Sequence, residues 1–341
     1  MLFWQKRCAV LMLCGLLVLT MLIVAMTLWA MLALYYSDLQ SYPARACLAG
    51  LFGLVTVCAF AQLPKRGRTF ICFCVVFCLL AAWWATISPA NNRDWQDDVA
   101  VLPRATIQGE RVMLHNIRNF TYRTDIDFTP GYYDKTFDLA RLSSVDLIAV
   151  YWMGDAIAHI MLSFGFGGTD YVTFSIETRK EKNEEYSTLK GFFKQYELIY
   201  IVGDERDLIR LRTDYRDPQE DVYVYRLRST QEGARLLFLE YVNKINRLYD
   251  APEFYNTLTT NCTTDVVALA RALGSDMRYS WKVVFSGYAP EYAYELGKLD
   301  SRLPFAELRR RSLINPRAHA VGEDPDFSVK IRDVLPRPTA W

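Results

Sequence analysis

The first 90 residues are almost continuously apolar, whereas the rest of the chain alternates short apolar and polar stretches. Three apolar runs lie in this N-terminal part, at residues 8–34, 46–63 and 69–87. Each is close to or above the about 20 residues that a helix needs to cross a bilayer. The first run is too long for a signal peptide, and two more follow it. The pattern therefore predicts a three-helix membrane anchor over residues 1–90 and a second domain over residues 91–341.

Basic residues at the ends of the apolar runs predict the orientation of the anchor. Lys6 and Arg7 precede the first run, and Lys65, Arg66 and Arg68 fill the loop between the second and third runs. Because cytoplasmic loops carry an excess of Lys and Arg, we expect the N-terminus and this loop in the cytoplasm. The third run then leads to the opposite side. We therefore expect a multi-pass protein of the bacterial inner membrane with its second domain in the periplasm.

The second domain mixes strand and helix patterns, so its expected fold class is α+β. Strand-like stretches occupy residues 104–119, 145–152, 196–202 and 222–227. Apolar residues recur at helical spacing over 231–249, and Pro252 ends that pattern. A further short helix is expected over 290–299. The chain from Asn315 onward is rich in proline and charge, and we expect it to be extended.

Two strand-like runs, 156–165 and 170–177, flank a glycine-rich turn and predict a β-hairpin. If the loop is 166–168, His159 lies directly opposite Ser175, and Glu177 is its diagonal neighbour. A one-residue change in loop length would place a different residue opposite His159. The hairpin thus gathers a histidine, a serine and a glutamate on one face.

A cysteine opens the last strongly helical pattern of the domain. The polar residues 259–261 precede Cys262, apolar residues follow it at helical spacing, and Gly274 stands where a C-cap glycine is expected. A thiol in a first helical turn lies near the positive end of the helix dipole, which favours the thiolate.

Cys262 is also the one cysteine after Cys78; the others lie in or beside the apolar runs, where they are expected to pack as small apolar residues. In an oxidising compartment it has no disulfide partner within its domain. Cys262 is therefore a candidate nucleophile, and the alternative is a buried inert thiol.

A nucleophilic cysteine needs a base, and the chain has three histidines: His115, His159 and His319. His319 lies in the proline-rich tail, where we expect it to be solvated, and nothing around His115 resembles a site. His159 on the predicted hairpin is the candidate base. Its alternative is a half-buried core histidine with a structural partner.

Further residues would complete the site. Ser175 or Glu177 is expected to orient the imidazole; Glu177 is the stronger electrostatically and Ser175 the better placed. Asn261 or the backbone N–H of Cys262 would meet developing negative charge, although Asn261 serves equally well as a helix N-cap. Arg179 is expected to support the site or to form a salt-bridge network with the charged cluster at 204–207.

Several chemistries are disfavoured by the sequence. The glycine-rich residues 165–168 precede a strand rather than a helix, so they form a turn and not a phosphate-binding loop. The number and spacing of the histidines argue against a zinc site, and we expect neither a metal nor another cofactor. A net charge of +1 gives no basic field for nucleic acid.

Four segments carry a family resemblance: NFTYRTDIDFTPGYYDKTFDL, AHIMLSFGF, FSIETRKEKNEEYSTLKGFFKQYELIYIVGDERDLIRLR and FYNTLTTNCTTD. Together they resemble the DUF4105 family, which corresponds to the periplasmic domain of Lnb-type lipoprotein N-acyltransferases. A histidine on a strand followed by Asn-Cys at a helix start is also similar to the circularly permuted NlpC/P60 (papain-like) thiol fold. The resemblance spans about residues 100–300.

The resemblance implies that Cys262 accepts the acyl group and that His159 is its base. The expected function is an acyltransferase that forms a thioester from a phospholipid donor and passes the acyl chain to an amine, as on a lipoprotein. One rival is a cysteine peptidase or amidase that cleaves cell-wall peptides, as classical NlpC/P60 domains do. Another is a non-catalytic envelope protein that keeps the fold alone.

Overall fold

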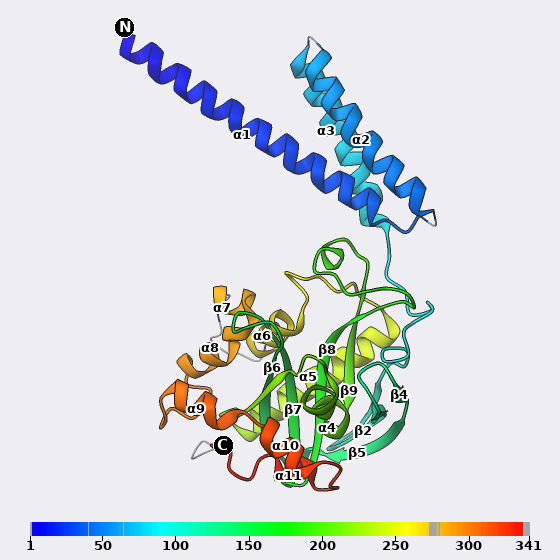
Figure 1. Ribbon diagram of the computed structural model, residues 1–341, viewed down its shortest axis with the longest axis vertical. Coiled ribbons are helices and arrows are strands. Elements are labelled where there is room, and N and C mark those ends of the chain that lie inside the picture. Colours follow the sequence, from blue (N-terminus) through cyan, green and yellow to red (C-terminus); the bar gives the residue numbers. More distant parts are fainter. Residues whose placement is uncertain (1, 40, 64, 273–277, 279, 337–341) are drawn as a thin grey trace. The chain divides into compact units, whose positions relative to one another are not determined.

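The computed structural model describes the whole chain except residues 1, 40, 64, 273–277, 279 and 337–341 (Figure 1). The chain forms two compact units: residues 1–89 with 187–195, and residues 90–186 with 196–341. The inclusion of 187–195 in the first unit was not predicted, since the sequence assigns this segment to the second domain. The expected C-cap at Gly274 lies outside the described residues.

The first unit contains three long helices, α1 (Leu2–Tyr35), α2 (Tyr42–Gln62) and α3 (Arg66–Thr86). All three are long and apolar enough to cross a membrane, which confirms the prediction of three candidate spans. The Ser41 hydroxyl accepts a hydrogen bond from the Ala44 N–H and so caps the start of α2, where Pro43 occupies the first turn.

Residues 187–195 are fixed to the C-terminal end of α3. The Lys194 ammonium donates to backbone carbonyls there, the nearest being that of Ile87 at 2.9 Å. Helix C-termini leave carbonyls without intrahelical partners. A cation satisfies these carbonyls and interacts favourably with the negative end of the helix dipole. Phe193 adds an aromatic stack on Tyr36, with 5.7 Å between ring centroids. The segment is therefore an integral part of the membrane unit.

The second unit is built on a mainly antiparallel sheet in the order β1-β2-β9-β8-β7-β6-β10, with β5 paired to β2 (Figure 1). The strands are β1 (Arg104–Gln108), β2 (Arg111–Arg118), β5 (Tyr132–Asp138), β6 (Leu142–Tyr151), β7 (Ala158–Phe166), β8 (Asp170–Arg179), β9 (Glu197–Gly203) and β10 (Asp221–Arg226). The short strands β3 (Thr121–Tyr122) and β4 (Phe128–Thr129) form a separate pair. The mixed α+β class is confirmed, and the permuted NlpC/P60 topology stays a prediction.

The single strand expected over 104–119 is wrong, because the stretch folds into the β1–β2 hairpin. Gly109 adopts a φ of 59° at the turn, a conformation that glycine reaches without steric cost. The weak alternation of the sequence reflects two strands with opposite directions rather than one.

Helices cover both faces of the sheet. Helix α5 (Gln231–Asp250) packs on one face, where Phe238 and Tyr241 contact the aromatic rings of Phe164 and Phe174. The remaining helices are α4 (Glu205–Leu208), α6 (Cys262–Ala272), α7 (Trp281–Val284), α8 (Ala289–Glu295), α9 (Phe305–Ser312), α10 (Asn315–Val321) and α11 (Phe327–Lys330). Burial of this apolar surface on both faces is the main stabilising contribution to the unit.

The expectation of an extended C-terminal tail is wrong. Residues from Asn315 form α10 and α11, which lie side by side, and Phe327 and Ile331 are fully buried in the cluster on the second face (Figure 1). Pro316 stands in the first turn of α10. Proline is tolerated there because a backbone N–H at that position would have no partner within the helix. The proline content therefore marks a helix start.

A buried arginine joins this tail to the sheet. The Arg332 guanidinium donates to Asp146 on β6 at 2.8 Å and to both carboxylate oxygens of Glu205 on α4 at 2.6 and 2.7 Å. These side chains are at most 2% exposed. Buried charges are tolerated when each has a partner, and removing one partner leaves the other uncompensated.

We predict that Arg332→Met destabilises the unit by about 3–5 kcal/mol, because Glu205 then stays charged and buried without its partner. The matched control is Arg310→Met. The Arg310 side chain is 73% exposed and pairs with Glu307, and such surface pairs contribute less than about 1 kcal/mol to the free energy of unfolding. Urea unfolding of the full chain in detergent, followed by near-ultraviolet circular dichroism, measures both. Equal midpoints for the two variants would contradict the prediction.

Candidate active site

The β7–β8 hairpin differs in register from the prediction. Phe166 pairs with Asp170, so the loop is 167–169 rather than 166–168, and Met161 rather than His159 lies opposite Ser175. If the same register is extended by two residues beyond this pair, His159 comes opposite Glu177. The predicted register was therefore wrong by two residues, but a two-residue shift keeps every side chain on the same face of a strand. His159, Ser175 and Glu177 consequently still lie on one face.

One nitrogen of the His159 imidazole is held by both of the expected partners. Nε2 lies 2.7 Å from the Ser175 hydroxyl oxygen and 3.1 Å from Glu177 Oε1. The Ser175 hydroxyl in turn donates to Glu177 Oε1 at 2.6 Å. Because Ser175 passes its hydroxyl proton toward the carboxylate, its oxygen is free to accept the Nε2–H. The sequence left Ser175 and Glu177 as alternatives, and the structure brings both to the same nitrogen.

Cys262 also interacts with the imidazole. It begins α6, which contacts β7 and β8. Its thiol interacts with the His159 side chain and with the backbone N–H of Ile160, and both interactions favour the ionised sulfur. Since Nε2 is occupied by Ser175 and Glu177, Nδ1 is the nitrogen left for the thiol. The arrangement is thus Cys262, then imidazole, then a hydroxyl and a carboxylate.

The electrostatics of these groups favour an ion pair. Burial alone would lower the pKa of His159, but the Glu177 carboxylate and the neighbouring Cys262 outweigh it and raise this pKa to about 9. Burial opposes ionisation of Cys262, yet His159 and the Ile160 N–H hold the pKa of the thiol below its ordinary value. These shifts favour the form of the pair in which the imidazole holds the proton and the sulfur is a thiolate.

Arg212 is a residue of this cluster that the sequence analysis missed. It lies in the π-helical segment η3 (Leu211–Tyr215), and its buried guanidinium donates to Glu177 Oε1 at 3.1 Å. Burial would raise the pKa of Glu177, but His159 and Arg212 hold it well below its usual range. Arg212 therefore keeps the carboxylate ionised, and no sequence pattern links it to a partner 35 positions away.

Asn261 is the N-cap of α6. Its side-chain oxygen accepts hydrogen bonds from the N–H groups of Thr263 and Thr264 at 2.9 Å, and its amide donates to the Thr257 carbonyl at 2.7 Å. These bonds occupy both ends of the side chain, so its amide is not directed at a reacting oxygen. The N-cap alternative is the one that the structure supports, and the cap fixes the helix start that presents Cys262.

Arg179 does not join the cluster. Its buried guanidinium donates to the carbonyls of Val99 and Ala100 and to the Asn91 side chain, and it stacks on Trp95. The salt-bridge network expected with residues 204–207 is therefore wrong. Arg179 instead fixes the polar linker that leads into the second unit, because its donors are used there.

The other two histidines lie apart from these residues. His115 on β2 is hydrogen-bonded to Asp134, with Nδ1 2.7 Å from the carboxylate. His319 lies in α10 and donates from Nε2 to the Thr213 carbonyl at 2.7 Å, and its side chain is exposed to solvent, as expected. In the described part of the chain, no group of three His, Cys, Asp or Glu side chains is arranged to hold a metal ion.

We predict that Glu177→Gln raises the apparent pKa of the Cys262 thiol by at least about 1 unit, since each unit is about 1.4 kcal/mol of charge interaction. Without the carboxylate, burial lowers the pKa of His159, and the imidazolium that stabilises the thiolate is lost. Ser175→Ala is the matched control with a smaller shift, because Glu177 Oε1 stays within 3.1 Å of Nε2.

The rate of alkylation by iodoacetamide, followed at the Cys262 peptide by mass spectrometry across a pH series, gives this pKa. An unchanged value in Glu177→Gln would show that the carboxylate does not control the pair.

Comparison with known proteins bears on the same residues. Residues 128–287 match the family model of the Lnb N-terminal periplasmic domain. No curated protein and no solved structure matches the chain. The matched region begins at β4 and includes His159, Ser175, Glu177, Arg212 and Cys262, whereas the membrane helices and α8–α11 lie outside it. The match supports a Lnb-type family for this domain and a periplasmic location for it.

Proposed function

We propose that this protein is a membrane-anchored thiol acyltransferase. Cys262 would take an acyl chain from a phospholipid and pass it to an amine, such as the N-terminal amine of a lipoprotein. The observation that carries the proposal is the contact of Cys262 with His159, whose Nε2 is held by Ser175 and Glu177. A thiol of lowered pKa beside an oriented imidazole is the arrangement of a covalent nucleophile and its base.

In the first half-reaction, the Cys262 thiolate attacks the carbonyl carbon of the lipid ester. A carbon–sulfur bond forms, and the carbon–oxygen bond to the glycerol backbone breaks. The departing alkoxide takes the proton held by His159, which leaves a lysophospholipid, a thioester and a neutral imidazole. Glu177 stabilises the imidazolium before this transfer and does not itself take the proton.

In the second half-reaction, an amine attacks the thioester carbon. His159, now neutral, accepts a proton from the attacking nitrogen as the carbon–nitrogen bond forms. The carbon–sulfur bond then breaks and the thiolate returns beside the imidazolium. The cycle ends with an amide product and the starting charge state of the pair.

Two observations favour a lipid donor over a soluble one. The three apolar helices attach the domain to a bilayer, where phospholipid is the most concentrated ester. The match to the Lnb N-terminal periplasmic domain agrees with the acyltransferase that the sequence resemblance implies. Peptide hydrolysis by the same thiol is the rival, and it requires water rather than an amine to attack the intermediate.

We predict that purified full-length protein, incubated in detergent with isotope-labelled phospholipid, gains the mass of one acyl chain that hydroxylamine removes. Cys262→Ala is expected to abolish the adduct, and His159→Ala to slow its formation by about 100-fold or more, the range for loss of a general base. His115→Ala is the matched control and is expected to behave as wild type, because His115 lies apart from the cluster.

Intact-mass spectrometry reads the adduct. Absence of an adduct with any phospholipid, together with cleavage of a cell-wall peptide that depends on Cys262, would replace acyl transfer with hydrolysis. Absence of both activities would support a non-catalytic role.

We also predict that the rate of lysophospholipid release falls as pH rises through about 9. The pKa of His159 is raised to about 9, so the imidazolium that donates to the leaving alkoxide persists below this pH and is lost above it. In Glu177→Gln the same decline is expected at lower pH. A release rate that keeps rising above pH 9 would contradict a protonated His159 as the acid.

A further inference from the structure

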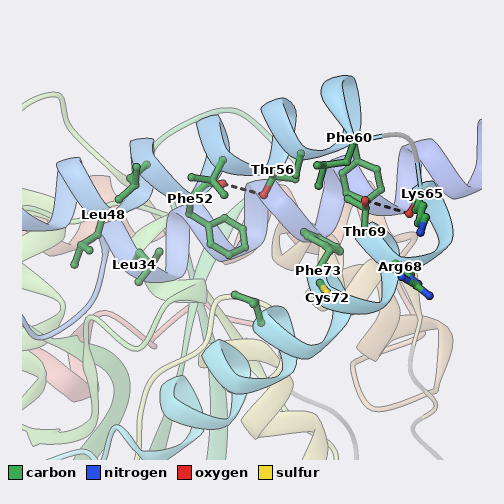
Figure 2. Close-up of a pocket in the computed structure, with 15 residues that line it drawn as sticks. Leu34, Leu48, Phe52, Thr56, Phe60, Lys65, Arg68, Thr69, Cys72 and Phe73 are labelled. Carbon is green, nitrogen blue, oxygen red and sulfur yellow. Dashed lines mark hydrogen bonds between the residues drawn. The ribbon is translucent and has the colours of Figure 1, made fainter.

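The membrane unit contains an apolar groove between α2 and α3 (Figure 2). It encloses about 600 Å³, within the about 300–1,000 Å³ typical of small-molecule sites. Its lining runs from Leu34 and Leu48 at one end to Lys65 and Arg68 at the other. Leu48 and Phe60 are 12 positions apart, about 18 Å along a helix at about 1.5 Å per residue, so the groove exceeds the depth of one leaflet.

On the floor of the groove, the polar side chains of the described residues are hydrogen-bonded. The hydroxyls of Thr56 and Thr69 donate to carbonyls of their own helices, those of Phe52 and Lys65. The Phe73 ring, 8% exposed, packs against neighbouring rings on this floor. A ligand in this groove therefore needs a flexible apolar body with no hydrogen-bonding groups along most of its length, which is the chemistry of an acyl chain.

One end of the groove is cationic. Lys65 caps the start of α3, and Arg68 lies in its first turn. Among the described residues, neither side chain has a hydrogen-bond or ion-pair partner. Two uncompensated cations at the mouth of an apolar groove are complementary to a phosphate joined to an acyl chain. Basic pockets between membrane helices on the cytoplasmic side bind anionic headgroups for this reason.

We propose that this groove is a specific binding site for an anionic phospholipid, with an acyl chain between α2 and α3 and the phosphate at Lys65 and Arg68. By the positive-inside rule the site has its cationic end, and with it the lipid phosphate, at the cytoplasmic surface. It is therefore separate from the periplasmic donor lipid of the proposed reaction and does not depend on that reaction. The bound lipid fills the groove and holds the two helices together.

A second copy of the chain is a poorer occupant than a lipid. Two copies inserted in the same orientation bring their own Lys65 and Arg68 to the same depth. Like charges at that level repel, because no acidic side chain among the described groove residues offsets them. An anionic lipid neutralises the same charges and supplies the apolar body that the groove lacks.

Native mass spectrometry of the full chain in detergent tests the proposal. The protein is titrated with phosphatidylglycerol or with phosphatidylethanolamine carrying the same acyl chains. We expect tighter binding of phosphatidylglycerol, and about a 5-fold loss of its affinity for each of Lys65→Gln and Arg68→Gln, the usual effect of one cation near an anionic headgroup. Arg45→Gln, which removes a cation near the start of α2, at the opposite end of that helix from Lys65, is the matched control and is expected to leave this affinity unchanged.

A groove-filling variant separates the contribution of the apolar lining to lipid affinity from that of the two cations. Ala59→Phe keeps both cations and is expected to lower the affinity for phosphatidylglycerol, with helix content checked by circular dichroism. Equal affinities for the two lipids, or phosphatidylglycerol binding unchanged in the Lys65→Gln, Arg68→Gln double variant, would overturn the proposal. A dimer that survives lipid addition and is lost in Ala59→Phe would assign the groove to a second copy instead.

Discussion

The chemistry of the site depends on one constraint: the His159 imidazole interacts with a carboxylate and with the Cys262 thiol at the same time. Ser175 and Glu177 occupy Nε2, and the imidazole also interacts with the Cys262 thiol. A free imidazole beside a thiol would share its proton in either direction. With the carboxylate behind it, the positive charge is favoured on the ring, and the negative charge is left on sulfur. The chemical character of the site follows from this polarity.

The surrounding fold supplies the rigidity that the constraint requires. Strands β7 and β8 are central in the sheet, so the spacing of His159, Ser175 and Glu177 is set by backbone hydrogen bonds. Arg212 reaches the far side of Glu177 from the segment after α4 and keeps the carboxylate charged. The α6 cap at Asn261 fixes the point at which Cys262 enters. Sites carried on regular elements hold their geometry better than sites on loops.

The sequence predicted the main chemical groups because they lie in strong local patterns. Cys262 follows a polar stretch and opens an amphipathic segment, and His159 lies on a hairpin strand. The register of that hairpin was harder to predict, since Gly167 and Gly168 both adopt positive φ and such turns permit several loop lengths.

Arg212 gave no local signal, because its role depends on the tertiary contact with Glu177. The C-terminal tail was misjudged from its composition, although the four-residue spacing of Phe327 and Ile331 is a helical pattern that burial explains.

The most direct test is the ionisation state of Cys262 near neutral pH, read as the difference in ultraviolet thiolate absorbance between the wild type and Cys262→Ser. A free cysteine is only a few per cent thiolate at about pH 7. We predict a much larger thiolate fraction at that pH, which declines on acidification and is lost in His159→Ala. A thiolate signal that first appears near the ordinary pKa of a cysteine, with or without His159, would contradict a polarised pair.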